Sequence, residues 1–167
     1  WKNIQLAMEM GFHPIKINTV ALGGVNEDEL AALAGLTFKH PLHIRFIEQM
    51  PLGGAWPKTG TPLLAPEIMA RLAALGRLEP VARQPFDGPA RRLRFIGAVG
   101  EIGFITAVSE HFCHTCNRLR LTADGRLRSC LFSEKTTDIK TALRTGGDDD
   151  AVAGIILKAV AGKPSRH

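Results

Sequence analysis

Two short apolar stretches, "IKINTV" (15–20) and "LHIRFI" (42–47), decide the fold class of this chain. Both are rich in branched aliphatic residues, which is typical of buried strands. Between them, Asn26 and Glu29 predict a capping box at the start of a helix with an apolar stripe. A strand, a helix and a second strand in this order predict two parallel, neighbouring strands joined by a helical crossover.

The chain as a whole predicts an α/β protein in two parts, residues 1–50 and residues 51–167. The stretch "PLGGAWPKTGTPLLAP" (51–66) is rich in proline and glycine and predicts an ordered loop or linker. Beyond it, "RRLRFIG" and "EIGFITAVS" predict two antiparallel strands joined near 97–100. Further helices are expected at Asn3–Met10, Pro66–Leu75, Asp138–Arg144 and Asp150–Val160.

Composition narrows the possible partners and the compartment. The chain has 167 residues with 21 lysines and arginines against 16 acids, a net charge of +5 that suits an anionic ligand. No apolar run reaches the ~20 residues that span a bilayer, so no membrane partner is expected. An odd number of cysteines argues against a disulfide framework, and reduced thiols indicate the cytoplasm. We see no signal peptide, and a chain that opens on Trp1 inside a helix reads as a piece of a longer protein.

All three cysteines lie in "CHTCNRLRLTADGRLRSCLF" (113–132), with the spacing C-x2-C-x13-C. The Asp-Gly pair at 124–125 predicts a hairpin with two possible registers. A two-residue loop would place Cys130 opposite Leu119, away from the face of Cys116. A loop of 123–125 with Gly125 in a left-handed bulge would instead place Arg118 opposite Cys130.

The second register has a chemical consequence. In this register, five side chains lie on the same face of the hairpin: Cys116, Arg118, Arg120, Arg128 and Cys130. One metal centre could then gather the cysteines beside several arginines. The leucines at 119, 121 and 127 would pack behind. We therefore expect the three sulfurs to converge.

Several kinds of site fit this pattern. Structural zinc would need a fourth ligand, and His111 and His114 are the nearest. A redox C-x-x-C pair would leave Cys130 without a role. An iron–sulfur cluster held by three thiolates, with one iron open to substrate, explains both the missing ligand and the adjacent arginines. The arginines could also be a solvated hairpin face, as "RRLR" (91–94) is expected to be.

This cysteine stretch resembles the C-terminal part of the GTP 3′,8-cyclase family, molybdenum cofactor biosynthesis protein A. The resemblance extends to "GFITAVSEHFCHTC" (103–116), "IRFIEQMPLG" (44–53), "KIN" (16–18) and the closing "AVAGKPSRH" (159–167). It implies a radical S-adenosylmethionine enzyme with an incomplete (βα)6 barrel, followed here by an antiparallel cluster-binding extension and C-terminal helices.

The implied reaction is a step of molybdopterin biosynthesis. It converts GTP to (8S)-3′,8-cyclo-7,8-dihydroguanosine 5′-triphosphate, with the radical abstracting hydrogen from the ribose C3′. An N-terminal cluster cleaves S-adenosylmethionine, and a C-terminal [4Fe-4S] cluster binds the guanine through its open iron. The resemblance assigns that cluster to Cys113, Cys116 and Cys130.

The same resemblance assigns the remaining site residues. Arg118, Leu119 and Arg120 fall in the motif that contacts GTP. Lys16 matches a lysine that holds the nucleotide phosphates, and Arg45 lies on a strand that is expected to face the barrel interior. Met50 matches a methionine that lines the S-adenosylmethionine site.

Two departures limit what this chain could do alone. The C-x3-C-x2-C motif of the S-adenosylmethionine-cleaving cluster is absent, because all three cysteines lie in 113–130, and the family's glycine-terminated tail is absent as well. We expect an inactive fragment whose partner is the missing N-terminal half, and exposed apolar surface could make it a homodimer. The alternative function is a zinc-stabilised nucleic-acid-binding module, but the 16 acids and the few aromatics count against it, so no nucleic acid is expected.

Overall fold

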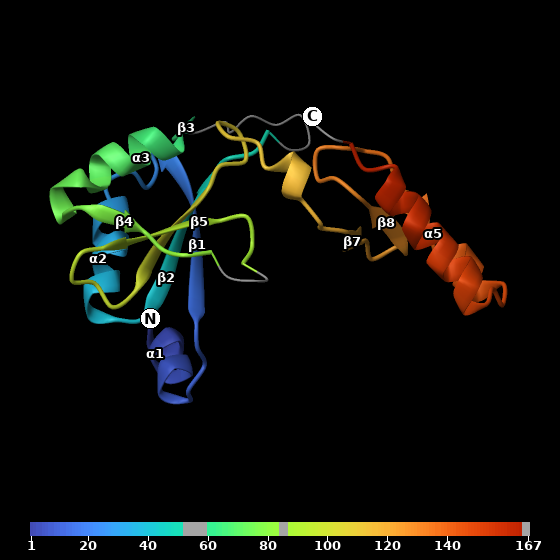
Figure 1. The fold of residues 1–167 in the computed structure, drawn as a ribbon, viewed down its shortest axis with the longest axis horizontal. Helices are drawn as coiled ribbons and strands as arrows, with labels where there is room; N and C mark the ends of the chain where they lie inside the picture. The colour runs from blue at the N-terminus through green and yellow to red at the C-terminus, as the bar shows by residue number, and fades with distance from the viewer. Residues whose placement is uncertain (52–59, 84–86, 165–167) are drawn as a thin grey trace. The chain divides into compact units, whose positions relative to one another are not determined.

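A computed structural model describes residues 1–51, 60–83 and 87–164 of the chain. It is a mixed α/β structure in two compact units (Figure 1). The first comprises Trp1–Met50 with the described residues of 55–111, and the second comprises Pro51 with the described residues of 112–167. None of the described helices is long and apolar enough to cross a membrane. Most of the linker expected at 51–66 lies outside the described residues.

The first unit is built on a six-stranded mixed sheet with the order β3-β1-β2-β6-β5-β4. Its strands are β1 (Ile15–Gly23), β2 (Leu42–Glu48), β3 (Thr61–Pro62), β4 (Leu78–Pro80), β5 (Arg91–Phe95) and β6 (Glu101–Ile105). The two stretches that decided the fold class are β1 and β2, and they pair in parallel, with Ile15 opposite Leu42 and Val20 opposite Ile47. The prediction of two parallel neighbours is confirmed.

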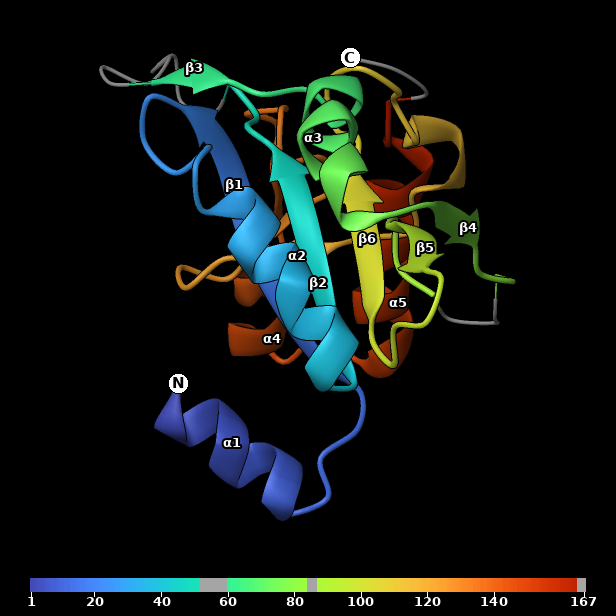
Figure 2. The same cartoon turned by 90° about the vertical axis from the view of Figure 1, so that its left-hand side faces the viewer.

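Helices cover one face of this sheet (Figure 2). They are α2 (Leu30–Lys39) and α3 (Ala65–Leu72), which continues into the 3-10 turn η1 (Ala73–Leu75), whereas α1 (Lys2–Glu9) precedes β1. Alternate residues of β2 point to the covered face, so Leu42, Ile44 and Phe46 are almost completely buried. The other face therefore carries the intervening polar residues.

The pairing of β6 corrects the expectation that the later part of the chain is purely antiparallel. β5 and β6 are antiparallel, as predicted, with Arg92 opposite Gly103. However, β6 also pairs in parallel with β2, with Arg45 opposite Gly103. The later part of the chain thus contributes strands to the same sheet as β1 and β2, and a closed barrel is not formed by the described residues.

The capping box expected at Asn26 does not form. Helix α2 begins at Leu30, with Glu29 as an N-cap that makes no side-chain hydrogen bond. The Asn26 amide instead accepts from Leu22 N and donates to Val20 O, both at 2.9 Å. Asn26 thus satisfies backbone groups at the end of β1, a competing local use of such side chains.

The second unit is a three-stranded antiparallel sheet with the order β7-β8-β9 and two helices. Its elements are η2 (Cys113–Thr115), β7 (Arg120–Leu121), β8 (Arg126–Arg128), β9 (Thr137–Asp138), α4 (Lys140–Arg144) and α5 (Asp149–Ala161). Leu127, Ile139 and Ala159 form its small buried core, against which Val152 and Ile155 pack. Helix α5 thereby fixes one face of the hairpin.

Candidate metal centre and nucleotide-binding residues

The cysteine hairpin adopts the bulged register. Arg120 pairs with Arg128 and Leu121 with Leu127. Gly125 has a φ of +80°, the left-handed conformation expected for the bulge. A Cβ at this position would also lie 2.6 Å from the Cβ of Lys140, so space and backbone conformation both require glycine here.

This register gives the hairpin one basic face and one apolar face. Leu127 is buried against α5, whereas Arg120 and Arg128 lie on the opposite side of the strands. The expected packing of the leucines is only partly right: Leu121 is 66% exposed. It lies on β7, the outer strand of the sheet, whereas α5 packs against β8 and β9.

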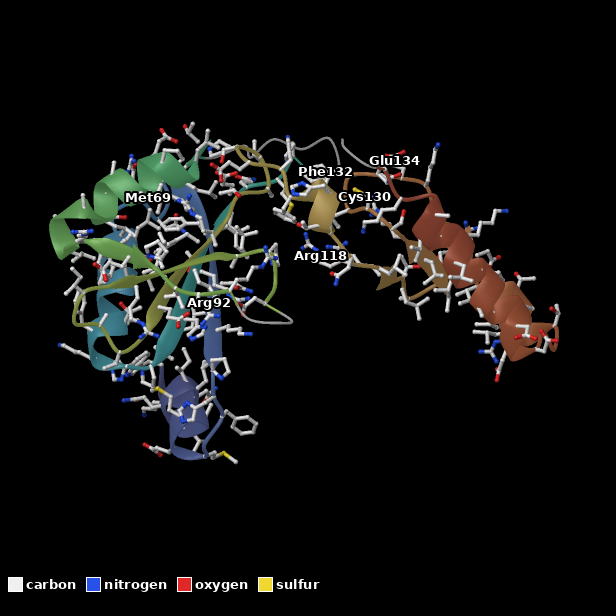
Figure 3. The ribbon with its side chains drawn as sticks, viewed as in Figure 1. Met69, Arg92, Arg118, Cys130, Phe132 and Glu134 are labelled. Carbon is white, nitrogen blue, oxygen red and sulfur yellow. The ribbon has the colours of Figure 1, made fainter. Side chains whose placement is uncertain are left out.

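The three thiols lie on the segments that lead into and out of this hairpin. Cys113 begins η2, Cys116 follows it in an extended conformation, and Cys130 comes two residues after β8 (Figure 3). All three are reduced and half-buried. Among the described residues, no group of three or more histidine, cysteine or acidic side chains lies close enough to hold a metal ion. The expected convergence of the three sulfurs is thus not seen; thiols do not draw one another together, and such sites generally assemble with their metal.

The environment of Cys116 favours the form of sulfur that binds metals. Burial alone would raise the pKa of the Cys116 thiol. Hydrogen bonds from the backbone and side chain of Arg118, with the charges of Arg118 and Lys163, outweigh burial and lower that pKa. Because the thiolate is the ligating form, this donor set fits a centre held by cysteine.

Arg118, the first residue of the R-x-R segment, lies directly against this thiol. The guanidinium carbon of Arg118 is 5.0 Å from the centroid of the Phe112 ring, a cation–π contact. Leu119 and Arg120 are half-buried. Arg120 faces Arg128 across the strands, and like charges in that position repel. Within the part of the chain that the structure describes, Arg120 has no ion pair, so an anionic ligand would relieve this repulsion.

The first unit carries a second set of cations, on the face of its sheet opposite α2 and α3. Lys16 is opposite His43, and Asn18 is opposite Arg45, so Lys16 and Arg45 lie diagonally on neighbouring strands. Lys16 is exposed and Arg45 is half-buried. Burial lowers the pKa of Arg45 most, and the nearby charges partly offset one another. Neither side chain forms an ion pair within the described ranges.

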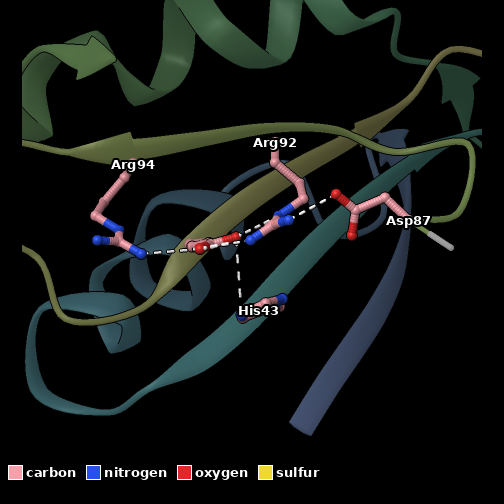
Figure 4. Close-up of polar contacts among 5 residues, drawn as sticks. His43, Asp87, Arg92 and Arg94 are labelled. Carbon is pink, nitrogen blue, oxygen red and sulfur yellow. Dashed lines mark hydrogen bonds and ion pairs between the residues drawn. The ribbon is translucent and has the colours of Figure 1, made fainter. Parts of the chain in front are cut away.

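Two arginines of β5, Arg92 and Arg94, are paired with acids (Figure 4), whereas Lys16 and Arg45 are not within the described residues. Arg92 binds Glu101 through two hydrogen bonds of 2.7 and 3.0 Å and reaches Asp87 at 2.6 Å. Arg94 donates to the same Glu101 carboxylate at 2.8 Å. His43 is 3.7 Å from it. The expectation that "RRLR" is a solvated face is wrong for Arg92, because a buried acid on β6 draws it inward.

Glu101 and Arg92 hold each other in their charged forms. Burial would raise the pKa of Glu101, but the hydrogen bonds from Arg92 and Arg94 lower it overall. The pKa of Arg92 is raised, first by its hydrogen bond to Glu101. Two of the positive charges on this face are therefore neutralised locally, and Lys16 and Arg45 remain available for a ligand.

Gly103 makes room for Arg45. A Cβ at residue 103 would lie 3.0 Å from Arg45 Cγ and 3.3 Å from Ala90 Cβ. Any side chain there would therefore displace the stem of Arg45. Sequence reasoning missed this role, because the register that places Gly103 beside Arg45 joins two distant segments.

Sequence reasoning also missed Glu48, a carboxylate on the buried face of β2. It is 1% exposed and accepts hydrogen bonds from the backbone N–H groups of Ala65, Val108 and Ser109 and from the Ser109 hydroxyl. It thus ties the start of α3 to the loop that leads to the cysteines. The sequence did carry a signal for this role. Glu48 falls at a position of the strand that alternation predicts to be buried, and a buried carboxylate needs hydrogen-bond partners. Met50, two residues further on, is half-buried, and its predicted contact with S-adenosylmethionine stays a prediction.

Comparison with known families identifies the chain. A family model described as Molybdenum Cofactor Synthesis C matches residues 42–167. The chain belongs to this family. The match includes all three cysteines, the R-x-R segment, Arg45 and Met50, whereas Lys16 precedes it.

Several curated relatives of this chain are named GTP 3′,8-cyclase. The chain is 50% identical to the protein of Pelotomaculum thermopropionicum, with all of this chain and 52% of the relative covered. It is 46% identical to the Heliobacterium modesticaldum protein and 44% identical to the Moorella thermoacetica protein, again with all of this chain and 52% of each relative covered. The chain spans about half the length of these relatives and corresponds to their C-terminal region.

Proposed function

We propose that this chain is the cluster- and substrate-binding part of a GTP 3′,8-cyclase, which acts in molybdenum cofactor biosynthesis. Two observations on the hairpin support the proposal: its register puts Arg120 and Arg128 on one face, and Arg118 hydrogen-bonds the Cys116 thiol. Membership in the Molybdenum Cofactor Synthesis C family supports it. Reduced thiols also fit the cytoplasm, where we place the enzyme.

The residues that would hold a cluster are Cys113, Cys116 and Cys130. Three half-buried, reduced thiols, one of them with a lowered pKa, fit a [4Fe-4S] cluster with three cysteine ligands. When bound, such a cluster offers an iron without a cysteine ligand, at which a purine nitrogen or oxygen can bind. Arg118 stands beside Cys116 and supplies hydrogen bonds to the sulfur, a known means of tuning such sites.

The family resemblance assigns GTP binding to cations that form no ion pair with an acid among the residues that the structure describes. On the hairpin, Arg120 with Arg118 can grip phosphate oxygens through paired N–H donors, and Leu119 lies between them. In the other unit, Lys16 and Arg45 are the cations that Glu101 leaves unneutralised. Their proposed role is to bind the triphosphate and so fix where the ribose C3′ lies.

Turnover requires residues outside this sequence. The three cysteines of the chain are all assigned to the substrate-side cluster, so the S-adenosylmethionine-cleaving cluster must be held by the remainder of the longer protein. Met50 is proposed to contact S-adenosylmethionine there. The partial (βα)6 barrel is proposed to be completed by the same remainder, along the part of β1 that β3 does not pair.

Metal analysis of the full-length protein after anaerobic reconstitution tests the proposal. We expect about four irons attributable to these three cysteines, with a reducible cluster whose electron paramagnetic resonance spectrum changes when GTP is added. One zinc, no iron at these cysteines and no response to GTP would replace the proposal with the zinc-stabilised nucleic-acid-binding alternative.

A further inference from the structure

The end of α5 is joined to both sides of the cysteine hairpin by one ammonium group. Lys163 Nζ donates to the carbonyl oxygen of Arg118 at 2.8 Å and to that of Ser129 at 3.0 Å. Arg118 lies two residues after Cys116, and Ser129 immediately precedes Cys130. A single side chain thus bridges the two segments that carry these cysteines.

This bridge lies where the strand pairing stops. The β7–β8 ladder pairs Arg120 with Arg128 and Leu121 with Leu127, and the cysteines lie beyond its open end. Ladder hydrogen bonds therefore do not set the separation of the two segments at the cysteines. Both Lys163 hydrogen bonds are partly buried and charge-assisted, the stronger class of hydrogen bond.

Lys163 is itself held in place by α5. The helix is capped at its start by Asp148, whose side chain accepts from Ala151 N at 2.9 Å. Near its end, Ala159 is buried in the core with Leu127. Beyond the helix, the Lys163 N–H donates to Val160 O at 3.1 Å. The ammonium is therefore presented from an anchored backbone.

We propose that Lys163 is a positioning residue for the cluster. Its ammonium fixes the separation of the segments carrying Cys116 and Cys130, so that both thiolates can bind one centre, and it places a positive charge beside that centre. This role rests on the proposed function, because it presupposes a cluster at these cysteines.

Two consequences follow from the position of Lys163. Without the bridge, the open end of the hairpin can separate, so the cluster should be lost more readily. Without the charge, the reduced and more negative state of the cluster is less stabilised, so the reduction potential should fall. The second consequence distinguishes Lys163 from a residue with only a structural role.

The test compares variants of the full-length protein. Lys163→Met removes the ammonium but keeps the apolar stem, and Lys158→Met makes the same change at an exposed position of α5. Cys113→Ala defines the iron held elsewhere in the protein. We measure iron release to a chelator, the midpoint potential of the cluster, and hydrogen exchange of residues 117–131 in the metal-free protein.

For Lys163→Met we expect at least fivefold faster iron release, a lower midpoint potential and faster exchange of 117–131, with Lys158→Met matching the wild type. If Lys163→Met unfolds α5, hydrogen exchange of 149–161 will reveal it, and Lys163→Arg, which keeps the charge and donors, should restore the potential. Unchanged release and potential in Lys163→Met would overturn the positioning role alone. Wild-type iron equal to that of Cys113→Ala would overturn the proposed function, and this role with it.

Discussion

Replacing Arg118 or Arg120 with alanine should weaken GTP binding by about 1.5–3 kcal/mol each, the usual contribution of a charge-assisted hydrogen bond. Both lie in the motif between the cysteines, and neither is a metal ligand. The iron content should stay constant in Arg120→Ala, which, unlike Arg118→Ala, removes no hydrogen bond to Cys116 that the structure shows. The matched control is Arg126→Ala, since Arg126 is exposed near the hairpin tip and is occupied with Asp124 and Thr136. GTP titrations of the reconstituted full-length variants measure these affinities. Equal GTP affinities in all three variants would show that Arg118 and Arg120 belong to a solvated face and do not bind GTP.

The stability of the protein should depend on the ionisation of Glu48. Burial would raise the pKa of Glu48, but hydrogen bonds from Ser109, Ala65 and Val108 outweigh it and lower the pKa below 4.5 in the folded state. The stabilisation is therefore fully present above the unfolded pKa and is lost as the pH falls through the folded pKa. Near neutral pH, Glu48→Gln should cost roughly 2–4 kcal/mol of unfolding free energy.

Denaturant unfolding near pH 7 and pH 4 measures this contribution. The difference between Glu48→Gln and wild type should shrink toward the acid end. Glu79→Gln is the control, because Glu79 is exposed and lies 3.9 Å from Arg77 in a weak surface pair. A Glu48→Gln protein as stable as Glu79→Gln at pH 7 would refute the role assigned to this carboxylate.

At the scale of elements, the hairpin turn is the most sensitive point. Gly125→Ala should destabilise the second unit and lower its iron content, because the left-handed backbone is strained and the new Cβ would meet Lys140 at 2.6 Å. Gly146→Ala separates the two causes, since Gly146 has a φ of +79° but no atom within 4 Å of the added Cβ. Thermal unfolding of both variants is compared; an equal loss would show that the contact with Lys140 contributes nothing.

The elements that could be predicted from sequence are those with a local signal. The order of strand, helix and strand predicted the parallel pairing of β1 and β2, and the Asp-Gly pair predicted the hairpin. The pair left two registers open, and the bulged one was favoured only because it put Cys116 and Cys130 on one face. The capping box at Asn26 failed because the same side chain is also suited to the turn after β1. The parallel pairing of β6 with β2 was missed because it depends on contacts between distant segments.

At the scale of the whole molecule, the site residues also divide into those with a local sequence signal and those without one. The cysteines and the R-x-R segment are proposed as site residues from their spacing, which is itself the signal. Lys163, Gly103 and Glu48 could not be proposed from spacing, since each acts through backbone groups or space that only the fold brings near it. The convergence of the sulfurs, which was predicted, is not present in the described residues; it would require a centre that binds them.

The central claim is that Cys113, Cys116 and Cys130 hold one iron–sulfur centre, and the iron content of single variants tests it most directly. In the reconstituted full-length protein, Cys113→Ala, Cys116→Ala and Cys130→Ala should each lose the same amount, about four irons. His114→Ala, which changes an exposed residue between two of the cysteines, should lose none. Unequal losses among the cysteine variants, or zinc that is released by His114→Ala, would contradict the claim.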